Sequence, residues 1–399
     1  MGFISCIMCL WSVGCGKEKK QFNGRSDCIL FNYDGNVYTE DYMVYNDRSG
    51  KKNIFSVADG NAMPYCFDPG CEHRKRSERK ESGEIVEQGC LAYDYNEAPF
   101  FLCGDSLYFL FSRALYCADL QGHNRRCIVK LTKPYVLYDN TCWYTEDALY
   151  VAYVLPYEVV QSMNNNGEAE WVAGERKEKQ EAGILRIPFS GEGEETIFCS
   201  DEYYDMQIVD LWLQERKLFF TVMGRDQPNP RNAAEYTSED WQTMVEEERK
   251  HTLLEIDEYD LSASTIHRIL EPKPYLGVYF YSEVFGIEQQ TGVLDLYRYS
   301  GERIAQTELS LYFGIRSDSG IYGWDTNTDE LVKLSETTGE IVRRSKLTGK
   351  DFDVTVVVGD SFFGGVVNSN HQLIKGYISA EDFWSGDKNG IIVFGESSQ

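Results

Sequence analysis

The stretch Gly104-Asp-Ser-Leu-Tyr-Phe-Leu110, followed closely by Leu115-Tyr-Cys-Ala-Asp-Leu-Gln-Gly122, decides the fold class of this chain. Apolar and aromatic residues alternate along both segments, and a period of two is typical of β-strands. Gly and Asp precede the first segment and Gly ends the second, and these residues favour tight turns. The stretch therefore predicts consecutive antiparallel strands that are bounded by turns.

The two phrases recur along the chain at regular distances. Seven modules each contain a residue that matches Leu115, and these anchors are Val44, Leu115, Leu185, Leu254, Leu296, Leu331 and Leu373. The intervals between successive anchors are 71, 70, 69, 42, 35 and 42 residues. A spacing near 40 is the length of one four-stranded propeller blade.

The three longer intervals each exceed a blade by about 30 residues, and each contains an atypical segment. These predicted insertions are a cysteine/histidine-rich segment at 58–98, a polar segment at 164–183 and a third segment at 225–250. We expect a helix in the third, because Ser238 can cap it and Trp241, Met244 and Val245 lie on one face.

We therefore predict an all-β chain that forms a single propeller domain over residues 28–399, with seven blades, a cysteine/histidine-rich insertion and one helical insertion. Closing blades into a ring leaves few exposed strand edges, which suits an all-β chain of this length. The alternative is a pair of β-sandwich domains. The propeller is favoured because no Pro/Gly/Ser-rich linker divides the chain and the phrases recur throughout.

Composition excludes some classes of partner. The 399 residues include 64 Asp and Glu against 39 Lys and Arg, a formal net charge of −25. Nucleic-acid binding needs clustered cations to displace counterions from phosphates, so we expect no nucleic-acid partner. With 42% hydrophobic and 14% aromatic residues, the chain has enough apolar material for a core, which argues against disorder.

The N-terminus has the features of an export signal. Residues 3–13 form an uncharged apolar run of signal-peptide length, too short to span a bilayer. The following Ser12-Val13-Gly14-Cys15 resembles the lipobox of bacterial lipoproteins, which implies lipidation of Cys15. We expect a signal peptide at 1–14, a charged tether at 15–27 and attachment to the outer face of the cell membrane through lipid alone. The alternative is a first strand or helix of the fold.

The segment Cys66-Phe-Asp-Pro-Gly-Cys71-Glu-His73, followed by Cys90, holds candidate metal ligands. Three thiolates and one imidazole make a closed tetrahedral set of the kind that binds structural zinc. In an exported protein the same cysteines can instead form a disulfide, with His73 uninvolved. The spacing favours zinc and the compartment favours a disulfide, so both alternatives stay open. No other cofactor is expected.

This cluster and the blade phrases together resemble a known group of proteins. The phrases around 107–126 are similar to those of exported bacterial propellers of the TolB and YWTD types. The segment PYCFDPGCEH, with Cys90 after it, resembles propeller lipoproteins of Gram-positive bacteria that form an uncharacterised family, a domain of unknown function. The resemblance covers most of residues 28–399. It implies a propeller at the cell surface and no established activity.

For function, we predict a monomeric binding module whose ligand is a protein or a carbohydrate. The ligand would sit at the central opening of the ring, lined by aromatic and acidic residues. The main alternative is a carbohydrate-active enzyme, a glycosidase or lyase, that uses carboxylates at this opening. A third interpretation is a structural surface protein whose insertions dock a partner. The sequence shows no convergent set of His, Arg and paired carboxylates, which favours binding.

Overall fold

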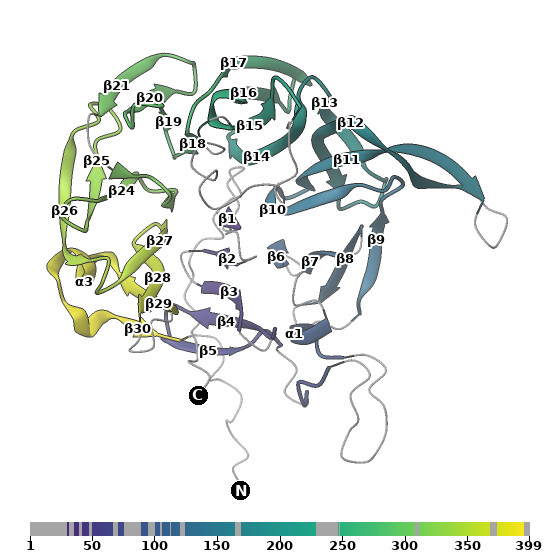
Figure 1. Cartoon of the computed structure of the whole chain (residues 1–399). Helices are drawn as coiled ribbons and strands as arrows, with labels where there is room; N and C mark the ends of the chain where they lie inside the picture. The colour runs from purple at the N-terminus through teal and green to yellow at the C-terminus, as the bar shows by residue number, and fades with distance from the viewer. Residues whose placement is uncertain are drawn as a thin grey trace, which may run out of the picture.

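Seven β-sheets surround a common centre and form the body of the molecule (Figure 1). The structure is a computed structural model. It describes residues 30–31, 36–39, 42–47, 50–66, 71–75, 89–94, 100–103, 106–111, 113–119, 124–163, 169–228, 246, 248–307, 311–367 and 373–394. The prediction of a seven-bladed, all-β propeller is confirmed, and helices are few and short among the described residues. We number the sheets as blades 1 to 7 along the chain.

The first three blades use consecutive strands. Blade 1 contains β1 (Leu30–Phe31), β2 (Val37–Tyr38), β3 (Tyr42–Asn46), β4 (Lys52–Ser56) and β5 (Asn61–Pro64). Blade 2 contains β6 (Phe100–Cys103), β7 (Ser106–Phe111), β8 (Ala114–Asp119) and β9 (Arg126–Lys130). Blade 3 contains β10 (Val136–Tyr144), β11 (Ala148–Met163), β12 (Ala169–Pro188) and β13 (Glu195–Ser200). The short helix α1 (Leu91–Asp94) lies between blades 1 and 2 in the chain.

The later blades follow the same plan, with one exchange between neighbours. Blade 4 contains β14 (Tyr204–Gln214), β15 (Lys217–Arg225), β16 (Thr252–Asp260) and β17 (Thr265–Lys273). Blade 5 contains β18 (Gly277–Phe280), β19 (Val284–Glu288), β20 (Leu294–Arg298) and β21 (Arg303–Thr307). Blade 6 contains β22 (Leu311–Tyr312), β24 (Ile321–Asp325), β25 (Glu330–Leu334) and β26 (Ile341–Thr348).

Blade 7 completes the ring. It contains β23 (Arg316–Ser317), β27 (Asp353–Val358), β28 (Ser361–Val367), β29 (Leu373–Ser379) and β30 (Ile392–Val393). In the sequence, strand β23 lies between β22 and β24 of blade 6, but it pairs in parallel with β27 of blade 7. The other strand pairs are antiparallel. Helix α3 (Ala380–Ser385) and the 3₁₀ turn η2 (Lys388–Gly390) lie between β29 and β30.

Each of the seven anchors lies in a different blade. Leu115 is in β8, for example, and Leu331 is in β25, the third strand of blade 6. Both of these side chains are fully buried. The repeated phrase in the sequence therefore marks one strand per blade, which is why counting it gives the number of blades.

The apolar cores lie between blades. One cluster joins blades 1, 2 and 3, and a second joins blades 3, 4 and 5. Two more join blade 5 to blade 6 and blade 6 to blade 7. The last joins blade 7 back to blade 1, where the ring of Tyr38 lies 5.4 Å from that of Phe363. The Tyr45 hydroxyl also donates to the carbonyl oxygen of Phe394 (3.0 Å), so side-chain contacts close the ring.

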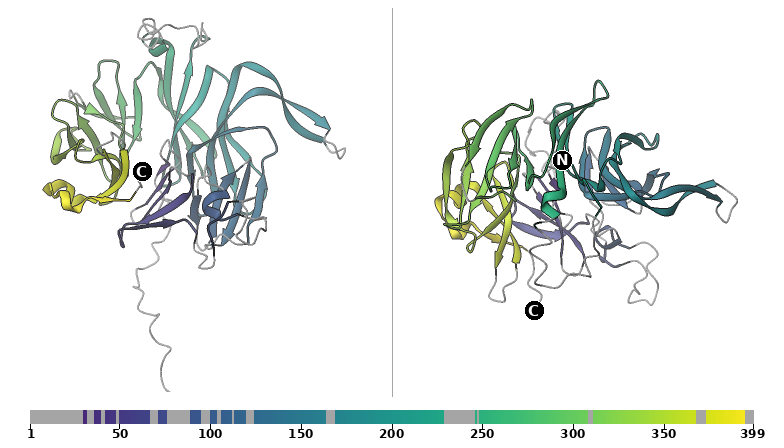
Figure 2. Two further views of the ribbon diagram at one scale, coloured as in Figure 1. Left: turned by 60° about the horizontal axis from the view of Figure 1, so that its bottom comes forward. Right: turned by 45° about the horizontal axis from the view of Figure 1, so that its top comes forward.

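One hairpin projects far beyond the ring. Strands β11 and β12 stay paired past the body of blade 3 and extend away from it (Figures 1 and 2). β10 pairs with β11 only as far as Val154, and β13 pairs with β12 only from Ala182 to Arg186. We call the two-stranded outer part, residues 157–163 and 169–176, the arm.

The predicted insertions are partly described. β5 falls within 58–98, and the described part of 164–183 belongs to β12. In 225–250, residues 246 and 248–250 are helical, while Ser238, Trp241, Met244 and Val245 lie outside the described residues. The apolar run at 3–13, Cys15 and the tether also lie outside them. Among the described residues, no helix has the length and hydrophobicity needed to cross a membrane.

Candidate functional site

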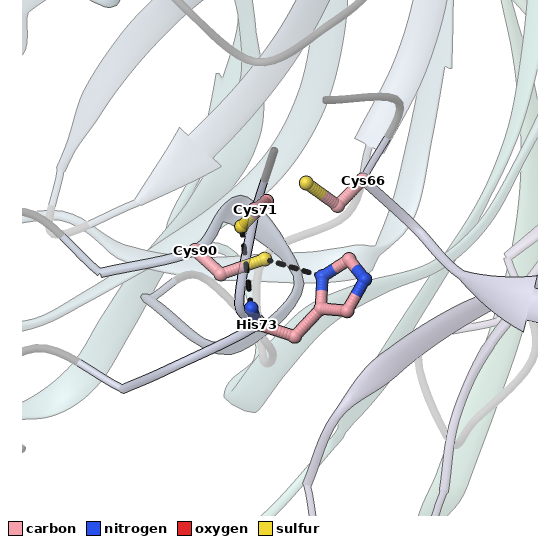
Figure 3. Close-up of side chains that lie close together, drawn as sticks. All are labelled: Cys66, Cys71, His73 and Cys90. Carbon is pink, nitrogen blue, oxygen red and sulfur yellow. Dashed lines mark hydrogen bonds between the residues drawn. The ribbon is translucent and has the colours of Figure 1, made fainter. Parts of the chain in front are cut away.

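The structure brings together all four residues of the predicted cysteine/histidine cluster (Figure 3). One ligand atom from each of Cys66, Cys71, His73 and Cys90 lies within 4.8 Å of every other. All four residues lie between β5 and blade 2 in the sequence. We call this set the Cys₃His cluster.

Cys66 is held by the edge of blade 1. The N–H of Tyr65 donates to the carbonyl of Lys52 (2.9 Å), which extends the pairing of β4 and β5 by one residue. Tyr65 itself is buried in the core between blades 1, 2 and 3. The residue before Cys66 is therefore fixed by packing, and the thiol leaves the blade from a defined position.

Cys71 and His73 are close in sequence and share a local contact. His73 has a positive φ of 50°, which is unusual for a residue other than glycine. The backbone N–H of His73 donates to the Sγ atom of Cys71 (3.3 Å).

Cys90 is fixed from both sides. Its N–H donates to the carbonyl of Arg74 (2.8 Å), and its own carbonyl accepts from the N–H of Tyr93 in α1 (2.9 Å). The side chain of Arg125, just before β9, donates to the carbonyl of Gly89 (3.1 Å). The cluster thus connects the edge of blade 1 to blade 2.

The electrostatics at Cys90 depend on whether a cation is bound. Burial raises the pKa of the Cys90 thiol, and the neighbouring Cys66 and Cys71 raise it further. Without a cation the buried thiol therefore stays protonated. A bound metal ion reverses this preference, since thiolates are deprotonated when they coordinate.

The donor set fits a tetrahedral metal ion. A zinc site with Zn–S bonds of about 2.3 Å places sulfur ligands roughly 3.8 Å apart. All four ligand atoms lie within 4.8 Å of one another, so no pair of sulfur atoms needs to close by more than about 1 Å. The Nδ1 atom of His73 is the nitrogen that faces the cluster, 3.5 Å from the Sγ atom of Cys90. The four residues could therefore hold a metal ion.

The three cysteines are thiols in this structure, with no disulfide among them. Thiols this close together can also be oxidised to a disulfide. The disulfide alternative from the sequence therefore stays a prediction beside the metal site.

The inner edge of the ring contains a buried ion pair that sequence reasoning missed. Arg316 on β23 donates to the carboxylate of Asp210 on β14, the innermost strand of blade 4. Asp210 also accepts the N–H of Leu211 (3.0 Å). Burial raises the pKa of Asp210 and the Arg316 charge opposes that rise. The buried hydroxyl of Tyr281 in blade 5 lies near the same guanidinium.

A second pair of carboxylates lies on β16, away from the centre. Glu255 and Asp257 are both buried, and Arg268 on β17 lies 3.2 Å and 3.6 Å from their oxygens. Burial, together with Asp257, raises the pKa of Glu255 to about 7. Burial also raises the pKa of Asp257 to about 6. Because β16 is the third strand of blade 4, these groups belong to the blade rather than to the central opening.

Comparison with known proteins yields only distant structural likeness. No protein-family model matches the chain, and a search of curated proteins gives no match. Among solved structures, oligogalacturonate lyase from Vibrio parahaemolyticus is similar over 90% of this chain and 86% of its own, at 11% identity and a TM-score of 0.46.

BamB from Moraxella catarrhalis is similar over 82% of this chain and 79% of its own, at 8% identity and a TM-score of 0.36. Dipeptidyl peptidase 4 from Porphyromonas gingivalis is similar over 90% of this chain, at 8% identity and a TM-score of 0.44. The chain spans only 58% of that peptidase. Likenesses at this level do not bear on activity or ligand.

Proposed function

We propose that this chain is a lipid-anchored, extracytoplasmic propeller that binds a partner protein through the arm. The arm is the observation that carries the proposal. A two-stranded hairpin that leaves its blade buries little surface by itself and is marginally stable in water. Here it extends from a ring that needs no such element to close.

The surface of the arm is unusually apolar for a solvent-facing hairpin. Four large hydrophobic side chains on it are exposed: Tyr157, Val160, Met163 and Trp171. Trp171 is 44% exposed and Met163 is 66% exposed. Trp171 pairs with Gln161, and Met163 is two residues further along the same strand, so the two apolar side chains share one face. Exposed aromatic and Met side chains of this kind are typical anchors of protein interfaces.

Both edges of the arm also lack a strand partner within the described residues. Unpaired N–H and C=O groups along a strand edge are a template for an added strand. A partner could therefore satisfy backbone groups at an edge while it covers the Trp171 face.

The test removes the arm and keeps the ring. Tyr157 and Arg176 are register partners, so replacing residues 158–175 with Asn-Gly closes a two-residue hairpin between them. Cell-envelope extract is passed over four immobilised proteins: wild type, this variant, Trp171→Ser and a control. The protein that wild type captures is then purified, and its affinity for each of the four is measured by titration. The control is Val342→Ser, which changes an exposed apolar residue on blade 6.

We expect the Val342→Ser variant to bind like wild type. Trp171→Ser should weaken binding at least about tenfold, as for an interface anchor, and the armless variant should not bind. Equal binding by all four proteins would show that the arm is not the docking surface. If wild type captures no envelope protein, the proposed function is wrong.

The lipid anchor is proposed at Cys15, on the strength of its lipobox-like context in the sequence. The test is incorporation of labelled fatty acid during expression in a bacterial host. Cys15→Ser should abolish labelling and release the protein from the membrane fraction. The matched control is Cys9→Ser within the apolar run, which should leave labelling intact. Labelling that survives Cys15→Ser would exclude this anchor.

The metal in the Cys₃His cluster is proposed to be structural zinc. Four protein ligands fill a tetrahedral shell, so the ion would connect blade 1 to the segment before blade 2 and would leave no position for substrate. Protein purified without reductant should contain about one zinc per chain, and Cys71→Ser should lose it. The control is Cys127→Ser, an exposed cysteine on β9 outside the cluster. Absence of zinc together with loss of two titratable thiols would establish the disulfide instead.

The carbohydrate-active enzyme is not proposed. That alternative needed paired carboxylates at the central opening. Asp210, a carboxylate at the inner edge of the ring, is engaged by Arg316, and the two carboxylates with raised pKa values, Glu255 and Asp257, lie within blade 4.

A further inference from the structure

A cavity of about 450 Å³ lies between blades 6 and 7 and beside α3. This volume is in the range of small-molecule sites. Its walls come from β24, β25 and β26 on one side and from the β27–β28 turn and α3 on the other. Figure 1 shows α3 at the outer edge of these two blades.

Two cations line this cavity as direct neighbours. Lys333 on β25 and Arg343 on β26 are register partners in the antiparallel pair, so their side chains leave the sheet on the same face. Like charges directly opposite each other destabilise a sheet. Neither cation forms an ion pair with a carboxylate in the part of the chain that the structure describes. In a chain of net charge −25, two adjacent cations without a carboxylate partner are unusual.

Both cations are held in place by aromatic rings. The Nζ atom of Lys333 lies 5.2 Å from the ring centroid of Tyr322, and the guanidinium of Arg343 lies 4.6 Å from the ring centroid of Trp384. The two rings are themselves stacked, 6.4 Å apart. Cation–π contacts position the charges without neutralising them, so an anion in the cavity can still bind both.

The backbone around Lys333 is adapted to this geometry. The Nζ atom donates to the carbonyl of Ser319 (3.0 Å) and retains two further N–H donors. Gly320, with φ of 141°, allows the close approach, because a Cβ atom there would lie 2.7 Å from the Cε atom of Lys333. The Ser319 hydroxyl donates to the carbonyl of Gly359 (3.1 Å), which ties this loop to the β27–β28 turn.

The opposite wall offers partners for hydroxyl groups. Asp360 is exposed in the β27–β28 turn and Ser361 begins β28, and both border the cavity. The Asp360 carboxylate can accept hydrogen bonds from ligand hydroxyls, whereas the buried Ser361 hydroxyl already bonds to the side chain of Tyr377. The aromatic rings offer little free surface for stacking, because Tyr322 and Trp384 are only 2% and 6% exposed. The cavity therefore fits a hydroxylated anion better than an aromatic one.

We propose that this cavity binds a small hydroxylated carboxylate the size of roughly one or two sugar rings, a sugar acid, with its carboxylate between Lys333 and Arg343. The ligand carboxylate accepts charge-assisted hydrogen bonds from both cations and relieves their mutual repulsion. The ligand hydroxyls face Asp360. This site lies in a different part of the ring from the arm, so it does not depend on the arm for binding.

The test is titration of the full chain by calorimetry with sodium glucuronate, with glucose as the neutral analogue and inorganic phosphate as the bare anion. Lys333→Gln and Arg343→Gln each remove one cation. The matched control is Arg344→Gln, which removes the same charge from the adjacent residue. Arg344 pairs instead with Asp325 (2.9 Å) and Glu330 (3.0 Å), outside the cavity.

We expect wild type and Arg344→Gln to bind glucuronate alike, with a dissociation constant on the order of 1 mM for a ligand of this size. Each cavity variant should weaken binding at least about tenfold, and glucose should not bind measurably. Thermal unfolding of each variant shows that it is folded. The proposal is overturned if glucuronate gives no saturable heat with wild type, or if the cavity variants bind it as wild type does. It is also overturned if phosphate binds as tightly as glucuronate, since the site would then recognise only a bare oxyanion.

Discussion

Substitution of Arg316 should lower the free energy of unfolding, because the buried Asp210 carboxylate would lose its countercharge. The carboxylate of Asp210 is 7% exposed and has the Arg316 guanidinium and one N–H as partners. Arg316→Met leaves this carboxylate buried without its countercharge, which typically costs about 3–5 kcal/mol. Asp210→Asn should cost less, because the remaining guanidinium is 27% exposed and can be hydrated in part. The double variant should regain much of the loss, since both charges are then gone.

The cost of Arg316→Met should also depend on pH. Burial already raises the pKa of Asp210, and loss of Arg316 raises it further. A carboxyl whose pKa is raised in the folded state binds a proton more tightly there than in the unfolded chain. Its contribution to stability therefore falls as pH rises between its unfolded and folded pKa values. Wild type and variant share the unfolded pKa, so the deficit depends on pH only between the folded pKa of wild type and the higher folded pKa of the variant. As pH is lowered through that window, we expect the deficit to shrink by about 1.4 kcal/mol per pH unit.

The assay is urea unfolding at pH 7 and pH 5, with the free energy of unfolding compared between variants. The control is Arg298→Met, which breaks an exposed pair with Glu302 and should cost less than about 1 kcal/mol. The reasoning is refuted if Arg316→Met and Asp210→Asn cost the same at both pH values. It is also refuted if the deficit of Arg316→Met grows as pH falls.

Three further predictions address other parts of the ring. Burial and Asp257 raise the pKa of Glu255 to about 7, so this group should lower the free energy of unfolding by up to about 3 kcal/mol as pH rises from 5 to 7. Glu255→Gln should remove this pH dependence, and an unchanged slope in the variant would contradict the raised pKa. Gly183→Ala should destabilise by about 3 kcal/mol in urea, because the new Cβ would lie 2.7 Å from the Tyr153 hydroxyl and closer still to the backbone oxygen of Phe198. A chelator should lower the melting temperature of wild type but not of Cys71→Ser, as scanning calorimetry can show.

The fold was predictable because its signal is local and repeated. Each blade contains the same short phrase, so the anchors could be counted without knowing how the strands pair. The exchange of β23 was not predictable, because Arg316 and Ser317 form a strand of two residues with no alternation to detect. The short strand β5 was also not predictable, since Asn61, Ala62 and Met63 are all exposed and show no alternation of buried and exposed residues.

The candidate sites differ in the same way. The Cys₃His cluster could be predicted because its ligands are chemically distinctive and three of them lie within eight residues of sequence. Arg316 and Asp210 lie 106 residues apart, and nothing in either local context indicates the other. Lys333 and Arg343 are only ten residues apart, but their pairing depends on a register shift at Lys333 and Leu334 that the sequence does not reveal.

The closing contact of the ring, between Tyr45 and Phe394, joins residues 349 positions apart in the chain. The entropy lost on closing so long a loop grows only with the logarithm of its length, by about 0.6 kcal/mol for each doubling. An extra 30 residues or so within it therefore changes this term by less than about 0.1 kcal/mol. Long segments such as the arm can thus be added at the rim while the joint between blades 7 and 1 is hardly affected. The architecture therefore allows surface segments to vary in length at almost no entropic cost to the joint that closes the ring.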